Sequence, residues 1–205
     1  MAQVNLKEIQ EYCKGKSIAL VGNSSNILRK RRGQEIDEHD IVIRMNHSVN
    51  VISQHYKDIG KRTDIYDCEV SPTHLVKTLI EKSNSKYVTR LIRWGDPKTN
   101  IKEKLIVNFA DKIFLGDPET HKNLKQNHFT YNVKPSTGAA IFNFLLQFTE
   151  FKSIDLYGFD FFTSGSELRN SMNEFQSYNY KDHSSQYESE YFKRFINEDT
   201  IKLIQ

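Results

Sequence analysis

The chain has 205 residues, of which 38% are hydrophobic and 27% are charged, a composition that indicates a soluble globular domain. Its formal net charge of +3 is too small for the strongly basic surface of a dedicated nucleic-acid binder, and no apolar run approaches the roughly 20 residues that span a bilayer. The N-terminal segment carries acidic residues and has no apolar core, unlike a signal peptide. The two cysteines, Cys13 and Cys68, form no disulfide framework, which favours a reduced, cytoplasmic protein.

Apolar periodicity predicts helices and strands in alternation along a single domain, residues 1–205. The first strand, Ile18–Val21, is a continuous apolar run, typical of a strand buried on both faces of a parallel sheet. We therefore predict an α/β, Rossmann-like domain with a mainly parallel sheet flanked by helices. The further predicted strands are Ile41–Met45, Asp64–Asp67, Tyr87–Ile92, Ile113–Leu115 and Ser153–Asp160, the last ending in a glycine turn. The predicted helices are Asn5–Lys14, Thr73–Ser83, Lys102–Phe109, one starting at Asp117-Pro118, an apolar helix after Pro135–Gly138, and one after His183 that runs to Ile196.

Two asparagines follow two of the predicted strands. Asn23 and Ser24 come after Gly22 at the end of the first strand, and Asn46 comes directly after Ile41–Met45. Ligands of open α/β sheets bind at the carboxyl ends of the strands, so both asparagines are expected in one pocket. The turn after the first strand offers hydroxyls and backbone N–H groups to an anion at a helix N-terminus. It lacks the later glycines of a dinucleotide fingerprint and the Gly-Lys-Ser/Thr of a P-loop, so phosphate binding and an ordinary turn are both open.

The run Arg29, Lys30, Arg31 and Arg32 is the one dense cationic segment. It fits a solvated helix end, where cations oppose the helix dipole favourably. It also fits a surface that attracts an anionic substrate or a membrane, and both interpretations are open at this point.

A second polar constellation lies in the last third of the chain. Ser136 or Thr137 is expected to cap the apolar helix, and with Gly138 and the first-turn amides they either form an anion site or cap the helix only. His183 precedes the last helix, where a lone histidine is structural or catalytic. Loops at Trp94–Pro97 and at 163–181, the latter expected to be mobile, are predicted to border the pocket.

These segments together resemble the animal-type sialyltransferases, the family defined by its sialylmotifs. The large motif is matched by VGNSSNIL at Val21–Leu28, GQEID at Gly33–Asp37, RMN at Arg44–Asn46 and GKRT at Gly60–Thr63. The small motif is matched by PSTG at Pro135–Gly138 and YGF at Tyr157–Phe159, and the very small motif by His183 and Glu188, with four residues between them. The order and the spacing of the motifs both agree with the family.

The chain also departs from the family's pattern. Ile18 and Thr149 stand where secreted-pathway members carry two cysteines bridged to each other, and we expect neither the membrane anchor nor the stem of those members. Both differences suit a bacterial or viral enzyme that folds in a reducing cytoplasm. The third motif, which contains a histidine in the family, here reads as Ser177–Tyr180, so Tyr178 or Tyr180 is the candidate to support the phosphate. A looser similarity to another bacterial sialyltransferase family runs through Gly158–Phe161.

The resemblance implies the sialyltransferase variant of the GT-A-like fold and an inverting transfer from a cytidine monophosphate (CMP) sugar, needing no metal and no cofactor. His183 would be the general base, because a histidine pKa lies near working pH. Glu188 would support the site as a structural partner. The donor would be held by Gly22, Asn23, Ser24, Asn46, Ser136, Thr137, Gly138 and Gly158. Gly158 would allow close approach of the nucleotide's base.

Three alternatives remain open at this point. The donor is CMP-sialic acid or CMP-Kdo, because sialic acid and Kdo share an anomeric carboxylate. A hypothesis from another functional class is a nucleotide-binding protein without transferase activity. A nucleic-acid binder that uses Arg29–Arg32 is the least favoured hypothesis. The expected acceptor is a glycan or glycolipid, and the basic run would allow peripheral contact with the inner membrane face.

Overall fold

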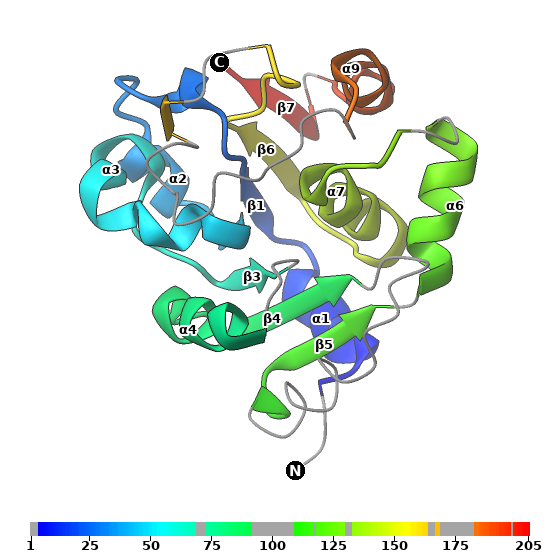
Figure 1. Ribbon diagram of the computed structural model, residues 1–205, viewed down its shortest axis with the longest axis horizontal. Helices are drawn as coiled ribbons and strands as arrows, with labels where there is room; N and C mark the ends of the chain where they lie inside the picture. Colours follow the sequence, from blue (N-terminus) through cyan, green and yellow to red (C-terminus); the bar gives the residue numbers. More distant parts are fainter. Residues whose placement is uncertain are drawn as a thin grey trace.

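The protein folds around one seven-stranded sheet in which every strand pairs in parallel (Figure 1). The computed structural model describes residues 4–68, 73–91, 109–116, 118–129, 133–163, 167–168, 183–197 and 199–205. The strands are β1 (Ser17–Val21), β2 (Ile41–Met45), β3 (Ile65–Asp67), β4 (Tyr87–Leu91), β5 (Ile113–Gly116), β6 (Ser153–Tyr157) and β7 (Ile201–Ile204). Their order across the sheet is β5-β4-β3-β2-β1-β6-β7.

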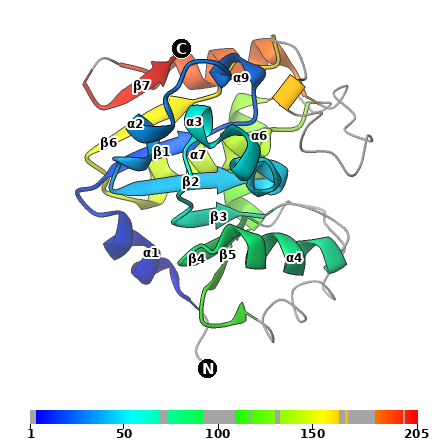
Figure 2. The same cartoon turned by 90° about the vertical axis from the view of Figure 1, so that its left-hand side faces the viewer.

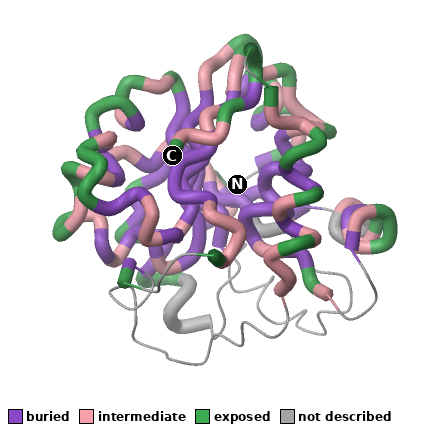
Figure 3. Tube along the Cα trace, turned by 90° about the horizontal axis from the view of Figure 1, so that it is seen from above, coloured by how far each residue is buried: buried purple, intermediate pink, exposed green. Residues whose placement is uncertain are grey.

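Helices pack on both faces of the sheet (Figure 2). They are α1 (Leu6–Cys13), α2 (Gly33–Asp37), α3 (Ile52–Ile59), α4 (Thr73–Ser83), α6 (Pro118–His128), α7 (Thr137–Phe148) and α9 (Ser185–Lys193), with 3-10 helices η1 (Ser25–Ile27) and η2 (Asn46–Asn50). Alternate residues of a strand face opposite sides, so Ile18 and Leu20 join the core under α1, α6, α7 and α9. Ala19 and Val21 join the core under α2 and α3. Figure 3 shows the buried strands at the centre and the exposed residues on the outer helices.

The sheet changes its winding direction at β1. From β1 the chain proceeds through β2, β3, β4 and β5 to one edge, and β6 and β7 are added on the other side of β1. Val21 at the end of β1 is therefore in register with both Arg44 of β2 and Tyr157 of β6. This is the topological switch point, where open α/β sheets bind their ligands at the carboxyl edge.

Residues of the segments that match the large motif connect α2 to the end of α3. The carboxylate of Asp37 accepts hydrogen bonds from the backbone N–H groups of Lys61 (2.9 Å) and Arg62 (3.0 Å). A Cβ on Gly33 would overlap the carbonyl oxygen of Tyr56, which explains the glycine. Arg44 is completely buried and donates from Nε to the carbonyl of Arg62 at 2.8 Å. These residues hold the loop before β3, and Arg44 itself extends from β2 into that loop.

The α/β class and the flanking helices are confirmed, and the sheet is entirely parallel. The helix predicted over Asn5–Lys14 is Leu6–Cys13, with Asn5 as its N-cap. Helices α2 and α3 and strand β7 were not predicted. The predicted loop Trp94–Pro97, nearly all of the predicted helix Lys102–Phe109 and most of the predicted mobile segment 163–181 lie outside the described residues. Within the described part of the chain, no helix has both the length and the apolarity needed to cross a membrane.

Candidate active site

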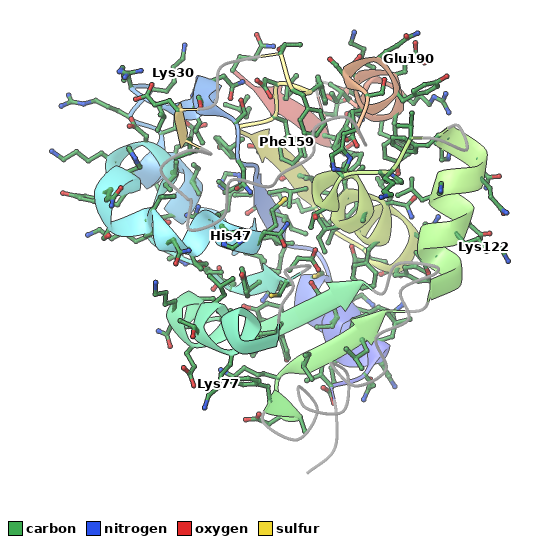
Figure 4. All side chains as sticks on the ribbon, in the orientation of Figure 1. Lys30, His47, Lys77, Lys122, Phe159 and Glu190 are labelled. Atoms are coloured by element: carbon green, nitrogen blue, oxygen red, sulfur yellow. The ribbon has the colours of Figure 1, made fainter. Side chains whose placement is uncertain are left out.

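The segments that follow β1, β2 and β6 meet the first turns of α7 and α9 at the carboxyl edge of the sheet. Figure 4 labels Phe159 and His47, which belong to the segments after β6 and β2, on the side that faces the viewer. Every predicted site residue that the structure describes lies at this edge; Tyr178 and Tyr180 lie outside the described residues.

The turn after β1 is fastened to the turn after β6. The N–H of Gly22 donates to the carbonyl of Tyr157 (2.7 Å), and the N–H of Ser24 donates to the carbonyl of Gly158 (3.0 Å). A Cβ on Gly22 would lie 2.5 Å from the Gly158 carbonyl oxygen, and Gly158 has a φ of +66°, which favours glycine. The close approach of the two backbones therefore accounts for both glycines without a ligand.

Asn23 and Ser24 have different surroundings in this turn. The Oδ1 atom of Asn23 is buried and has no hydrogen-bond partner among the described residues. Buried acceptors are normally satisfied, so this oxygen suits a donor group on a ligand. The Ser24 hydroxyl caps η1 by accepting from the N–H of Asn26 at 3.3 Å, a local structural role.

Asn46 joins the end of β2 to the start of α7. Its side chain is 5% exposed, and its amide nitrogen donates to the hydroxyl of Thr137 at 3.0 Å. Its carbonyl accepts a hydrogen bond from the hydroxyl of Tyr66. The backbone of Asn46 is left-handed, with φ of +51°, a conformation that asparagine adopts more readily than most residues. Such conformations persist where the surrounding contacts over-determine them, and they cluster at functional sites.

Glu188 holds the N-cap of α7. One carboxylate oxygen accepts from the backbone N–H of Ser136 (2.7 Å) and the other from its hydroxyl (3.0 Å), while that hydroxyl accepts from the N–H of Ala139 (3.0 Å). Glu188 is 2% exposed, and burial raises its pKa to about 7 even though the two hydrogen bonds from Ser136 lower it. This geometry places Glu188 behind the helix start as a support.

The ring of Phe159 separates the turn after β1 from the start of α7. A Cβ on Gly138 would lie 2.8 Å from the Cε1 atom of Phe159, and a Cβ on Gly22 would lie 3.0 Å from its Cδ2 atom. The ring also packs against Phe192 of α9, with centroids 5.2 Å apart. Sequence reasoning missed this role of Phe159, although the YGF segment contained the residue.

His183 lies just before the N-cap of α9, Ser184. Its Nδ1 atom is 2.8 Å from the carbonyl oxygen of Lys134. A carbonyl can only accept, so Nδ1 carries the proton and the lone pair of the neutral ring is on Nε2. The imidazole also stacks on Phe162, with centroids 5.4 Å apart and ring planes 2° apart. The contacts of His183 with Lys134 and of Glu188 with Ser136 join the start of α9 to the segment that enters α7.

The cationic run lies before α2, and carboxylates neutralise part of it. Arg29 pairs with Glu167 at 2.8 Å, and Arg32 pairs with Glu35 at 2.8 Å. Lys30 and Arg31 are exposed. In the described part of the chain, no group of three or more His, Cys, Asp or Glu side chains is arranged to hold a metal ion.

The model of the family described as Glycosyltransferase family 29 (sialyltransferase) matches residues 3–200 of the chain. Two similar curated proteins are both named CMP-N-acetylneuraminate-beta-galactosamide-alpha-2,3-sialyltransferase 1. The Gallus gallus protein is 25% identical over 155 residues and the Mus musculus protein 27% identical over 160 residues. Each alignment covers 69% of this chain but only 43% or 44% of the relative, so the chain spans less than half the length of these relatives.

Solved structures share the fold. A mammalian sialyltransferase in complex with Gal-beta-1-3GalNAc-ortho-nitrophenol matches with a TM-score of 0.61 and 20% identity, covering 93% of this chain and 69% of that one. The sialyltransferase CST-II in complex with a trisaccharide acceptor and CMP matches with a TM-score of 0.58 and 15% identity, covering 92% of this chain and 80% of that one.

Proposed function

Because this chain belongs to glycosyltransferase family 29, the sialyltransferases, we propose that it transfers sialic acid from CMP-sialic acid to a hydroxyl group of a glycan or glycolipid acceptor. The observation that carries the proposal is the hydrogen bond between His183 Nδ1 and the Lys134 carbonyl, because it fixes the Nδ1–H tautomer and so puts the basic lone pair of the neutral ring on Nε2. The structures of relatives with CMP and with acceptor sugars are consistent with a nucleotide-sugar donor and a glycan acceptor.

His183 acts as the general base in this proposal. Its Nε2 takes the proton from the acceptor hydroxyl while that oxygen attacks the anomeric carbon of the donor. The bond from the anomeric carbon to the phosphate oxygen breaks on the opposite side, so CMP leaves with the electron pair and the configuration inverts. A well-positioned general base contributes about a hundred- to ten-thousand-fold in rate.

The donor occupies the edge between β1, β2 and α7. Asn23 offers its buried amide oxygen, and Asn46 lies beside the helix start that contains Thr137 and Gly138. The first-turn N–H groups of a helix and its dipole favour an anionic group, which here is the phosphate of CMP. Ser136 contributes as the N-cap, because Glu188 already accepts from both its N–H and its hydroxyl.

The leaving group is a nucleoside monophosphate, which carries less charge than a diphosphate, and we therefore propose transfer without a metal ion. Activity is expected to survive a chelator unchanged. Loss of transfer in EDTA that added Mg²⁺ restores would overturn this part of the proposal.

His183→Ala tests the proposed base. Release of CMP is followed with CMP-sialic acid and a mixture of glycan acceptors, and in parallel with CMP-Kdo. The variant is expected to lose about a hundred- to ten-thousand-fold in kcat while its Kd for CMP stays within about twofold of the wild type. His55→Ala, on α3, is the control and is expected to keep full activity.

Three results would contradict parts of the proposal. Near wild-type transfer by His183→Ala would exclude the base assignment. Transfer from CMP-Kdo but not from CMP-sialic acid would contradict the assignment of sialic acid as the donor sugar. CMP binding by the wild type without transfer or donor hydrolysis would indicate a nucleotide-binding protein that is not a transferase.

We also propose peripheral contact with an anionic membrane through Lys30 and Arg31, since Arg29 and Arg32 are paired with carboxylates. Co-sedimentation with anionic vesicles is expected to weaken in high salt and in the Lys30→Glu/Arg31→Glu variant. Equal binding to neutral vesicles, or none to either, would refute it. The cytoplasmic location and the bacterial or viral source stay predictions from the sequence.

A further inference from the structure

We propose that Phe162 is a positioning residue for the reaction: its ring fixes the plane of the His183 imidazole so that Nε2 points at the acceptor hydroxyl. This inference rests on the proposed role of His183 as the base. Phe162 itself contacts no reacting atom in the proposal and acts only through the histidine.

Two contacts together define the orientation of the imidazole. The hydrogen bond from Nδ1 to the Lys134 carbonyl, at 2.8 Å, fixes the direction of one ring atom but leaves rotation about that bond. Stacking on Phe162, with the planes 2° apart and the centroids 5.4 Å apart, restricts that rotation. An offset stack of this kind is a favoured arrangement of two aromatic rings. With both contacts present, Nε2 has one direction.

The backbone that carries Phe162 is unusual. Phe161 and Phe162 both have left-handed backbones, with φ of +53° and +65°. Bulky residues rarely adopt this conformation, and glycine would adopt it at no steric cost. Two consecutive phenylalanines at such positions indicate that the rings themselves are needed there. Strained residues of this kind cluster at active sites.

The surrounding contacts hold this strained turn in place. The carboxylate of Asp160 accepts from the N–H of Phe162 (3.0 Å), and the Asp160 carbonyl accepts from the N–H (3.1 Å) and the hydroxyl (2.7 Å) of Thr163. The ring of Phe161 packs against Phe192 of α9, with centroids 5.5 Å apart. Phe161 therefore fastens the turn after β6 to α9. Phe162, the next residue in this turn, contacts His183, which lies just before the N-cap of the same helix.

Phe161 is the matched control that the chain offers. Both phenylalanines have the same backbone conformation and both contact the region of α9, but Phe161 packs on the core residue Phe192 and Phe162 packs on His183. A purely structural role predicts similar effects of the two substitutions on turnover. A positioning role predicts that only Phe162 affects it.

The test compares Phe162→Leu, Phe162→Tyr and Phe161→Leu, each assayed well below its Tm. Phe162→Leu is expected to lower kcat by about ten- to a hundred-fold, because small errors in the placement of a catalytic group have effects of this size. Its KM for the donor and its Kd for CMP are expected within about twofold of the wild type, and Phe162→Tyr is expected to retain kcat because it keeps the ring. Phe161→Leu is expected to lower Tm and keep kcat.

Two further measurements separate this inference from the proposed function. In a His183→Ala background, Phe162→Leu is expected to cause no further loss, because its effect passes through the histidine. In ¹⁵N-histidine-labelled protein, with His183→Ala to assign the signals, the Nδ1–H tautomer is expected in both the wild type and Phe162→Leu, because the Lys134 carbonyl sets it. The imidazole is expected to lose its single orientation in Phe162→Leu, which is measured as weaker nuclear Overhauser contacts between the His183 ring protons and their neighbours. This readout needs no turnover, so it holds even if the transferase assignment fails.

The inference is overturned if Phe162→Leu keeps kcat within twofold of the wild type. It is also overturned if Phe161→Leu lowers kcat equally, or if the nuclear Overhauser contacts of the His183 ring protons are the same in Phe162→Leu as in the wild type.

Discussion

Replacing Glu188 by glutamine is expected to remove a large part of the pH dependence of unfolding. Burial raises the pKa of this carboxyl from 4.5 to about 7, against the two hydrogen bonds from Ser136, which lower it. The unfolded chain releases the proton near pH 4.5, whereas the folded protein keeps it to about pH 7. The resulting stabilisation is fully present below about pH 4.5 and is lost as pH rises through about 7. A difference of roughly 2.5 pKa units corresponds to about 3 kcal/mol.

The assay is urea denaturation followed by far-UV circular dichroism from about pH 5 to about pH 8, for the wild type and Glu188→Gln. The free energy of unfolding of the wild type minus that of the variant is expected to fall by up to about 3 kcal/mol over this range. Contributions of other titrating groups cancel in the difference. Glu190→Gln, an exposed position on the same helix, is the control and should leave the slope unchanged. Parallel curves for the wild type and Glu188→Gln would refute the reasoning.

Three further changes test other parts of the structure. Asn46→Gly and Asn46→Ala both lose the side-chain amide and its hydrogen bond to Thr137, so titration calorimetry should show weaker CMP binding for both, and both should have a lower Tm. Asn46→Ala should be less stable than Asn46→Gly by about 1–2 kcal/mol, because only glycine adopts the left-handed backbone without steric cost. Gly138→Ala should cost about 1–3 kcal/mol in urea denaturation, because its Cβ would lie 2.8 Å from the Phe159 ring, and Phe159→Leu should relieve part of this cost in a double-mutant cycle. Additive costs would exclude that contact. Burial lowers the pKa of His39, but hydrogen bonds to Asp155 and to a backbone carbonyl outweigh this and raise it, so His39→Gln should destabilise the protein below about pH 6.5 and progressively less at higher pH. A loss independent of pH would contradict this.

The sequence predicted the sheet, and the edge at which the candidate site residues lie, for identifiable reasons. The runs of β1 and β2 are apolar at almost every position because both faces of these strands are covered, and this pattern distinguishes a parallel sheet. Once the strands are placed, the strand-end rule brings Asn23 and Asn46 to the same edge. Cap chemistry also indicated an anion site or a simple helix cap at the start of α7, and left His183 as structural or catalytic. The motif resemblance then favoured the functional interpretation of both.

Other features depend on contacts that no local pattern contains. The support of Ser136 by Glu188 joins residues that lie 52 positions apart. The stack of Phe162 on His183 requires left-handed backbones at two phenylalanines, which residue propensities argue against. Strand β7 was missed because it is a short edge strand at the end of the chain, with little alternation of burial.

The position of β1 at the switch point has a consequence for how the protein folds. Pairing of β1 with β2 brings Ile18 to Ile41, but pairing with β6 must bring Ser17 to Ser153. Closing such a long loop costs more entropy, and non-local parallel pairing is intrinsically slow. During synthesis one edge of β1 therefore stays open, as an unpaired and aggregation-prone strand, until β6 has left the ribosome. The two halves of the site join in that same late step, so a ligand that bridges them is expected to favour the closed sheet and act as a folding aid.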